Sequence, residues 1–130
     1  MDKEKIKQLD AYIKSGVSPI LIENIPIEVF EDEIIIDSNC DRKLLNGHYE
    51  GINFVAPEWY NQLINKTNPI LIINEINKIS TNEQIKFGEI LKYKKVSTFE
   101  LPKNCIIIVT CSNIKDNPIN EKIYSLFAQI

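Results

Sequence analysis

The amino-acid sequence predicts an α/β protein, a three-layer sandwich with a mainly parallel sheet of four to five strands. Short Ile-rich runs lack the alternation of a sheet with one solvated face, so we expect burial on both faces. Helical patterns separate these runs, which is typical of a parallel sheet. The chain has 130 residues, 44% hydrophobic and 25% charged, which is ordinary for a globular protein. We therefore expect one domain over residues 1–130.

Apolar periodicity and turn-forming residues place the elements in order. Gly16 is the expected stop of the first helix, and Pro57 suits the first position of another. Ser80 and Glu83 have the spacing of a helix capping box. The expected elements are a helix at 3–15, strands at 19–22 and 34–36, a loop or short hairpin at 44–56, a helix from 57, a strand at 69–73, a helix at 80–93, a strand at 105–110 and a helix at 119–127.

Charge and cysteine usage narrow the function classes. The net charge is -3 with acidic and basic residues interleaved, which disfavours nucleic-acid binding, and we expect residues 92–95 to be a solvated edge. Cys40, Cys105 and Cys111 form no CxxC pair, so reduced thiols are the simpler interpretation. The charged start of the chain is unlike a signal peptide, and no apolar run is long enough to span a bilayer. These features predict a cytoplasmic protein without a membrane partner.

Polar residues follow two of the most apolar runs. Asn74 and Glu75 end the run at 70–73, and the run at 105–109 continues into Thr110-Cys111-Ser112-Asn113. In an open parallel sheet, ligands bind outside the carboxyl ends of the strands. We therefore expect both polar groups to lie at one crevice.

The ordered set of motifs resembles the AAA+ ATPases, a group of P-loop NTPases, and within them the MoxR-like branch. Residues 70–77 (ILIINEIN) are similar to the Walker B strand, and 88–96 to the helix end and hairpin that follow it. Residues 101–104 (LPKN) lead into a strand resembling the one that ends at sensor 1. Tyr49-Glu50-Gly51-Ile52 and Ala56-Pro57-Glu58-Trp59 are also similar to that branch.

The resemblance implies roles for three residues. Glu75 matches the catalytic glutamate that polarises the attacking water, and Asn113 matches sensor 1. Asn74 stands where the family has the aspartate that helps to hold magnesium, and a neutral amide is a weaker ligand for a hard cation. We expect both catalytic positions to be vestigial and Asn74 to be a weak metal position.

The sequence departs from the family at the phosphate site. A P-loop needs glycines, a Lys and a Ser or Thr to bind phosphates and magnesium. Residues 23–33 (ENIPIEVFEDE) contain no Gly or Lys and have five acidic residues, and Pro26 lacks a backbone donor. We therefore expect a degenerate site that binds no ATP.

The helix that follows a P-loop is also absent from the sequence, because the next apolar run starts at Ile34. If strand order follows the family, the link at 24–33 must cross two strands, about 22 Å away, and it can extend to about 33 Å. The sheet can therefore form without that helix. We expect part of one sheet face to lose its cover and to expose an apolar patch.

Two further departures lie near the end of the sequence. Leu126 stands where the family usually has an arginine that reaches a neighbouring subunit's nucleotide. The sequence ends at Ile130, before any lid domain, so we expect none.

Simpler interpretations remain open for single residues. Glu75 and Asn113 are consistent with polar strand ends, and His48, the sole histidine, with a surface loop. No His or Lys lies beside Cys111 in sequence, so we do not expect a reactive nucleophile. Trp59 is expected to pack against the core.

The leading hypothesis is a pseudo-ATPase: a non-catalytic AAA+-like module, without cofactor, that binds a protein, either itself or an active AAA+ ATPase. The alternative is an ATP-binding ATPase subunit that uses ATP and magnesium and contributes Glu75 and Asn113 to a shared site. A third interpretation is a fragment or remnant without an independent role.

Overall fold

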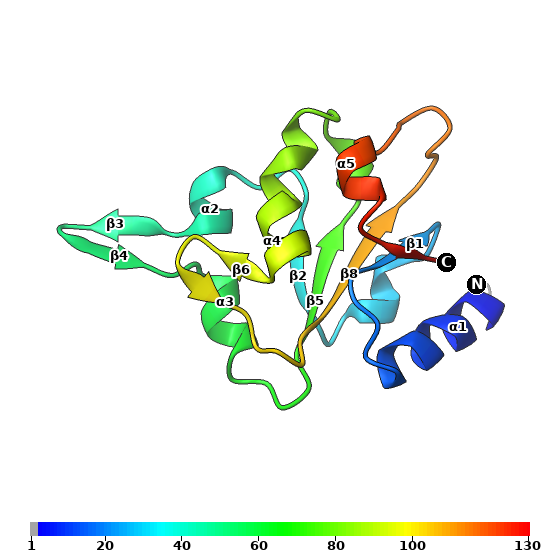
Figure 1. The fold of residues 1–130 in the computed structure, drawn as a ribbon, viewed down its shortest axis with the longest axis horizontal. Coiled ribbons are helices and arrows are strands. Elements are labelled where there is room, and N and C mark those ends of the chain that lie inside the picture. The colour runs from blue at the N-terminus through cyan, green and yellow to red at the C-terminus, as the bar shows by residue number, and fades with distance from the viewer. Residues whose placement is uncertain (1–2) are drawn as a thin grey trace.

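A computed structural model describes residues 3–130 and shows an α/β sandwich around a parallel sheet (Figure 1). Within these residues, five strands form the sheet in the order β2-β5-β8-β1-β9, and every pairing between them is parallel. The coarse fold prediction is therefore confirmed. The strands are β1 (Ile20–Glu23), β2 (Ile34–Asp37), β5 (Ile70–Asn74), β8 (Ile106–Cys111) and β9 (Ala128–Gln129).

Burial on both faces explains why the strands are continuous apolar runs. All six residues of β8 are buried, and successive side chains point to opposite faces. Ile106 and Ile108 join one apolar cluster, whereas Ile107 and Val109 join the other. The sheet thus separates two apolar layers, as the sequence predicts.

Helices cover the two faces. α1 (Lys3–Lys14) and the 3-10 turn η1 (Ile27–Phe30) cover one face, with Leu9 and Phe30 buried in its apolar cluster. The opposite face is covered by the elements that follow β2 along the chain. These are α2 (Arg42–Asn46), α3 (Glu58–Leu63), η2 (Ile76–Lys78), η3 (Glu83–Phe87), α4 (Gly88–Tyr93) and α5 (Glu121–Tyr124).

The link between β1 and β2 crosses β8 and β5 without a following α-helix, as the sequence predicts. The sequence predicts that part of this face loses its cover, and the structure limits the exposure to the margin of the face. Ile20, Ile22, Ile72 and Ile108 on that face have no exposed surface, because α1 and η1 replace the missing helix. On the edge strand Ile35 is 39% exposed, and Ile70 at the start of β5 is partly buried.

Two helix predictions need correction. The helix expected at 80–93 is divided into η3 and α4. Buried Gln84 donates to the backbone oxygens of Ile79 and Pro118, and Gly88, a weak helix former, lies at the junction. The contact between Ser80 and Glu83 does form, since the Glu83 N–H donates to the Ser80 hydroxyl at 3.2 Å.

The helix expected at 119–127 is a single turn, and the chain then pairs with β1 as β9. The Ala128 and Ile130 N–H groups donate to the Pro19 and Leu21 oxygens at 3.0 and 2.8 Å. These hydrogen bonds pair the backbone groups at the edge of β1, and buried backbone groups rarely stay unpaired. The pairing of β9 with β1 therefore ends α5 after one turn.

Two hairpins extend from the helical layer. The segment expected as a loop or hairpin forms α2 and then β3 (His48–Glu50) and β4 (Asn53–Val55), which project from one end of the molecule (Figure 1). The second hairpin pairs β6 (Lys95–Val96) with β7 (Phe99–Glu100). In residues 3–130, no helix has the length and apolar character required to cross a membrane.

Phe30 provides a test of the replacement cover. Phe30→Ala is expected to destabilise the protein by about 3–5 kcal/mol, because it leaves a cavity beneath η1. Phe30→Leu keeps most of the volume and should cost less than about 1.5 kcal/mol. Urea unfolding measures both. Equal stability of Phe30→Ala and the wild type would contradict a covering role for η1.

Candidate functional site

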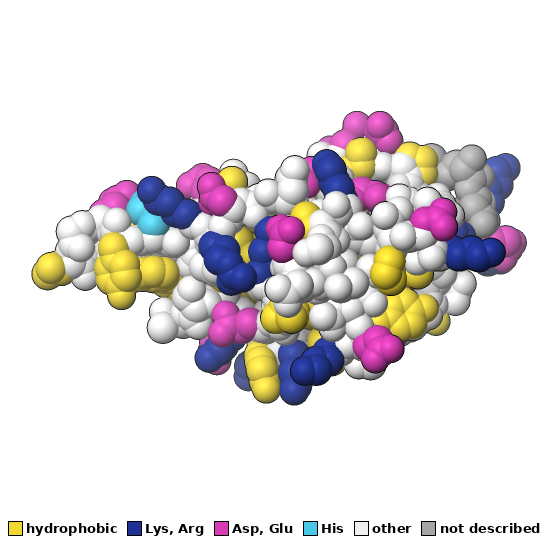
Figure 2. All heavy atoms as spheres, turned by 90° about the horizontal axis from the view of Figure 1, so that it is seen from above, with side chains coloured by type: hydrophobic (Ala, Val, Ile, Leu, Met, Phe, Trp, Pro, Cys, Tyr) yellow, Lys and Arg dark blue, Asp and Glu magenta, His cyan; other side chains and the backbone are white. Residues whose placement is uncertain are grey.

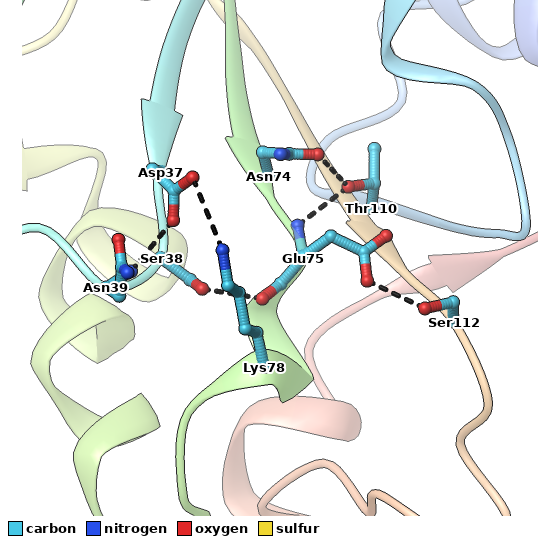
Figure 3. Close-up of polar contacts among 8 residues, drawn as sticks. All are labelled: Asp37, Ser38, Asn39, Asn74, Glu75, Lys78, Thr110 and Ser112. Atoms are coloured by element: carbon cyan, nitrogen blue, oxygen red, sulfur yellow. Dashed lines mark hydrogen bonds and ion pairs between the residues drawn. The ribbon is translucent and has the colours of Figure 1, made fainter.

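The carboxyl ends of β5 and β8 meet at one edge of the sheet, where polar side chains gather (Figure 3). Asn74 ends β5 and Glu75 follows it, while Thr110 lies near the end of β8 and Ser112 follows that strand. The structure therefore brings together the two polar groups expected at this edge. Ser38, which follows β2, joins them through a hydrogen bond.

Glu75 is held in an unusual backbone conformation. Its φ of 53° and ψ of 62° are left-handed, which costs a residue with a side chain about 1–2 kcal/mol. Its N–H donates to Thr110 Oγ1 at 2.8 Å, and its carbonyl accepts from Ser38 Oγ at 2.6 Å. Its carboxylate accepts from Ser112 Oγ at 2.7 Å. Three neighbouring segments thus fix both the backbone and the side chain of Glu75.

The amide of Asn74 is engaged within the protein. Thr110 Oγ1 donates to Asn74 Oδ1 at 2.9 Å while it accepts the Glu75 N–H (Figure 3). The oxygen expected as a weak metal ligand therefore already has a partner. Among residues 3–130, no group of three or more His, Cys, Asp and Glu side chains is placed to hold a metal ion.

Asn113 lies farther along the same chain segment. It is exposed, with a left-handed φ of 52°, and its carbonyl accepts from the N–H groups of Asp116 and Asn117. Ser112, not Asn113, bonds to the Glu75 carboxylate. The sequence places Ser112 in the polar group but gives no signal of this contact.

Asn77 holds the loop after β8 against β5. Its side-chain amide donates to the oxygens of Ser112 and Asn117 at 2.6 and 2.8 Å, and its Oδ1 accepts from the Ser112 N–H at 3.3 Å. The side chain is buried and uses both ends of its amide. Asn77 therefore positions Ser112 for its bond to Glu75.

The segment after β1 is the one for which the sequence predicts a degenerate phosphate-binding site. Asn24 has a left-handed φ of 58°, and its N–H donates to the Cys111 oxygen at 2.9 Å. Pro26, which has no N–H, precedes η1, and Glu28 lies in its first turn. The first backbone N–H after β1, that of Asn24, is thus already hydrogen-bonded within the protein. Acidic side chains follow it in the sequence.

A surface ion pair borders the cluster on the β2 side. Lys78 Nζ lies 3.9 Å from Asp37 Oδ2, and both side chains are about half exposed. Asp37 also accepts from the Asn39 N–H at 3.1 Å. Exposed ion pairs contribute little to stability, so Lys78 adds mainly positive charge to this edge of the sheet.

The thiol next to the cluster is poorly suited to nucleophilic chemistry. Burial, with smaller contributions from the nearby Glu23 and Glu75 carboxylates, raises the pKa of Cys111 to about 12. Burial also raises the pKa of Cys105 to about 11. The reactive form of cysteine is the thiolate, and these environments suppress it. Cys40, Cys105 and Cys111 are all free.

Other residues singled out in the sequence lie away from the cluster. His48 is on β3 and lies 3.1 Å from Glu50. Trp59 is buried and donates through Nε1 to the Leu45 oxygen at 3.1 Å, which confirms a packing role. Lys92 and Tyr93 are exposed at the end of α4.

Comparisons place the chain in no known family: no family model matches it, and a search of curated proteins finds no match. The structure defines an α/β protein with a parallel sheet and an internally bonded polar cluster at the strand ends. Functional inference therefore starts from these residues.

Thr110 provides a test of the hydrogen-bonded cluster. Thr110→Val keeps the side-chain shape but leaves the Glu75 N–H and the Asn74 oxygen without their shared partner. We expect a loss of about 1–3 kcal/mol in the free energy of unfolding, measured with urea. Thr110→Ser retains the hydroxyl and should lose less. Equal losses in both variants would argue against the hydrogen bonds.

Thiol alkylation tests the environments of the cysteines. In native protein at pH 8, iodoacetamide should modify Cys40 first, because it is only partly buried. Cys111, with a pKa of about 12, has a thiolate fraction on the order of 10⁻⁴ at that pH and should react only after unfolding. Peptide mass spectrometry measures each site. Rapid native modification of Cys111 would contradict its buried, carboxylate-flanked environment.

Proposed function

We propose that the chain is a non-catalytic AAA+-like module of the cytoplasm that acts by binding a protein, either a second copy or an active ATPase. The proposed relation to P-loop NTPases, and to their MoxR-like branch, is supported by two features. The strand order β2-β5-β8-β1 agrees with the order expected from the resemblance. The Walker B-like and sensor-like residues lie on adjacent strands, β5 and β8.

The observation that carries the non-catalytic proposal is the hydrogen bonding of Asn74 and Glu75 at the carboxyl ends of β5 and β8. Asn74 and Glu75 direct polar groups to Thr110 and Ser112, so magnesium coordination by Asn74 would compete with an existing bond. A neutral amide offers little charge to offset that loss.

Electrostatics supports the same proposal. The segment from Glu23 to Glu33 has five acidic residues and no Lys or Gly where a triphosphate would need positive charge and backbone donors. Like charges repel, although Glu28, Glu31 and Asp32 are exposed and water screens part of this repulsion. The carboxylates of this segment would therefore disfavour the phosphates.

The alternative, a subunit that completes a shared ATP site, is favoured by one feature. Glu75 keeps a half-buried carboxylate, oriented by Ser112, despite the cost of its left-handed backbone. Such strain often accompanies function. In that case a partner would supply the phosphate-binding loop, and Glu75 and Asn113 would act across the interface.

Nucleotide titration separates the two functions. We expect no saturable change in fluorescence when the protein is titrated with a fluorescent ATP analogue and magnesium up to about 1 mM, the limit of weak specific binding. Unlabelled ATP serves as the competitor. Saturable binding that ATP displaces would overturn the non-catalytic proposal, and loss of turnover in Glu75→Gln would then support the enzyme alternative.

A further inference from the structure

The β3–β4 hairpin presents an apolar end to solvent. Ile52 is 95% exposed and Tyr49 is 71% exposed, and Phe54 is also exposed on the same hairpin. We call these three residues the hairpin tip. In Figure 2 their hydrophobic side chains gather at the far end of the projecting hairpin. A contiguous exposed group of this kind is typical of a binding surface.

Aromatic contacts tie the hairpin tip to the body of the protein. Tyr49 packs edge-on against Phe54, with ring centroids 4.9 Å apart. Phe54 stacks on Phe99 at 5.9 Å, and Phe99 contacts Tyr60 at 5.4 Å. The hairpin is therefore held in place before any partner binds, which lowers the entropic cost of association.

Gly47 shapes the base of the hairpin. Its φ of +90° suits glycine, and a Cβ placed there would lie 2.3 Å from the Val55 oxygen. Glycine thus allows the chain entering β3 from α2 to approach the end of β4 closely. This local requirement maintains the direction in which the hairpin tip projects.

A concave surface between α4 and α5 is apolar, as the hairpin tip is. This α4–α5 groove has a volume of about 510 Å³ and is lined by apolar surface from Ile85, Tyr93 and Leu126. Its volume is in the range of pockets that bind small molecules or a few side chains. The groove is open, and Tyr93 is 64% exposed.

The charges on the two surfaces are complementary. Lys92 and Lys122 line the α4–α5 groove, and no acidic residue is among its lining residues in the described part of the chain. Glu50 lies two residues before Ile52 on the hairpin. Its carboxylate lies 3.1 Å from His48 Nε2, and its side chain remains 68% exposed. Opposite charges around an apolar contact favour one orientation of docking.

We infer that the hairpin tip of one copy docks into the α4–α5 groove of a second copy, with Glu50 facing Lys92 and Lys122. This inference rests on the proposed function, because it specifies the partner of a protein-binding module. In one molecule the hairpin projects away from α4 and α5, so it does not fill its own groove (Figure 1).

A head-to-tail contact fits these surfaces better than a two-fold contact between tips. A two-fold contact between tips would leave both α4–α5 grooves empty, because their lining residues lie outside the tip. In a head-to-tail contact one tip enters one groove, which leaves one tip and one groove free to add further copies. Self-association should therefore depend on protein concentration.

Mixing two complementary variants tests the head-to-tail contact. Ile52→Asp disables the tip and keeps the groove, whereas Ile85→Ser/Tyr93→Ser disables the groove and keeps the tip. Each variant alone should dissociate at least about tenfold more readily than the wild type. An equimolar mixture should form a one-to-one complex, because one intact tip and one intact groove remain. Sedimentation velocity and light scattering measure these states.

Ile64→Asp is the matched control, because Ile64 is an exposed isoleucine outside both surfaces. It should self-associate like the wild type, and circular dichroism should show that all variants are folded. A monomeric wild type at about 1 mM, unchanged association of the variants, or the absence of a complex in the mixture would each overturn the inference.

Charge reversal tests the proposed orientation. Glu50→Lys and Lys122→Glu should each weaken association of the protein, and the combined variant should recover a large part of the loss. Lys115→Glu is the control for added negative charge, since Lys115 is exposed and outside the groove. Additive losses in the combined variant would overturn the pairing of these two residues.

These outcomes are separate from the test of the proposed function. A monomer that also binds no ATP overturns only self-association and leaves another protein as the partner. ATP binding overturns the non-catalytic proposal, whatever the oligomeric state.

Discussion

Burial of β8 on both faces is the constraint on which the rest of this structure depends. Its six residues are buried, and its neighbours β5 and β1 bring further Ile and Leu side chains to both apolar layers. A parallel sheet of this kind is stable only if each face has a cover. The chain therefore uses α1 and η1 on one face where the resemblance implies a different helix. The core therefore forms with a short, acidic segment after β1.

Parallel pairing also determines the chemistry of the sheet edge. Because β2, β5 and β8 run in the same direction, their last residues meet, and Ser38, Glu75 and Ser112 become neighbours. Thr110 bonds to both Asn74 and Glu75 through one hydroxyl, so the left-handed turn at Glu75 is held in place. A cluster that satisfies its own polar groups is stable without a ligand. The same bonds oppose a magnesium ion that must take Asn74 as a ligand.

The apolar runs allow β1, β2, β5 and β8 and their parallel arrangement to be predicted, because strands buried on both faces have a strong sequence pattern. The meeting of the two polar groups follows from that arrangement. Long-range contacts determine the remaining features. β9 pairs with the edge of β1. Gln84, within η3, donates to the Pro118 oxygen in the loop before α5. The bond from Ser112 to Glu75 depends on Asn77, which only the tertiary structure brings close.

The absence of an α-helix between β1 and β2 leaves less apolar surface exposed on the sheet than the sequence suggests. The centre of the sheet face is covered, and Ile35 at its edge is 39% exposed. The largest exposure is instead at Ile52 and Tyr49, on a hairpin that contributes little to the sheet core. Apolar side chains that stay in water add no hydrophobic free energy to folding. Their burial against a partner would stabilise the complex by about 25 cal/mol per Å² of apolar surface. Rigid attachment of this hairpin through Phe54 and Phe99 therefore favours association as the role of the surface.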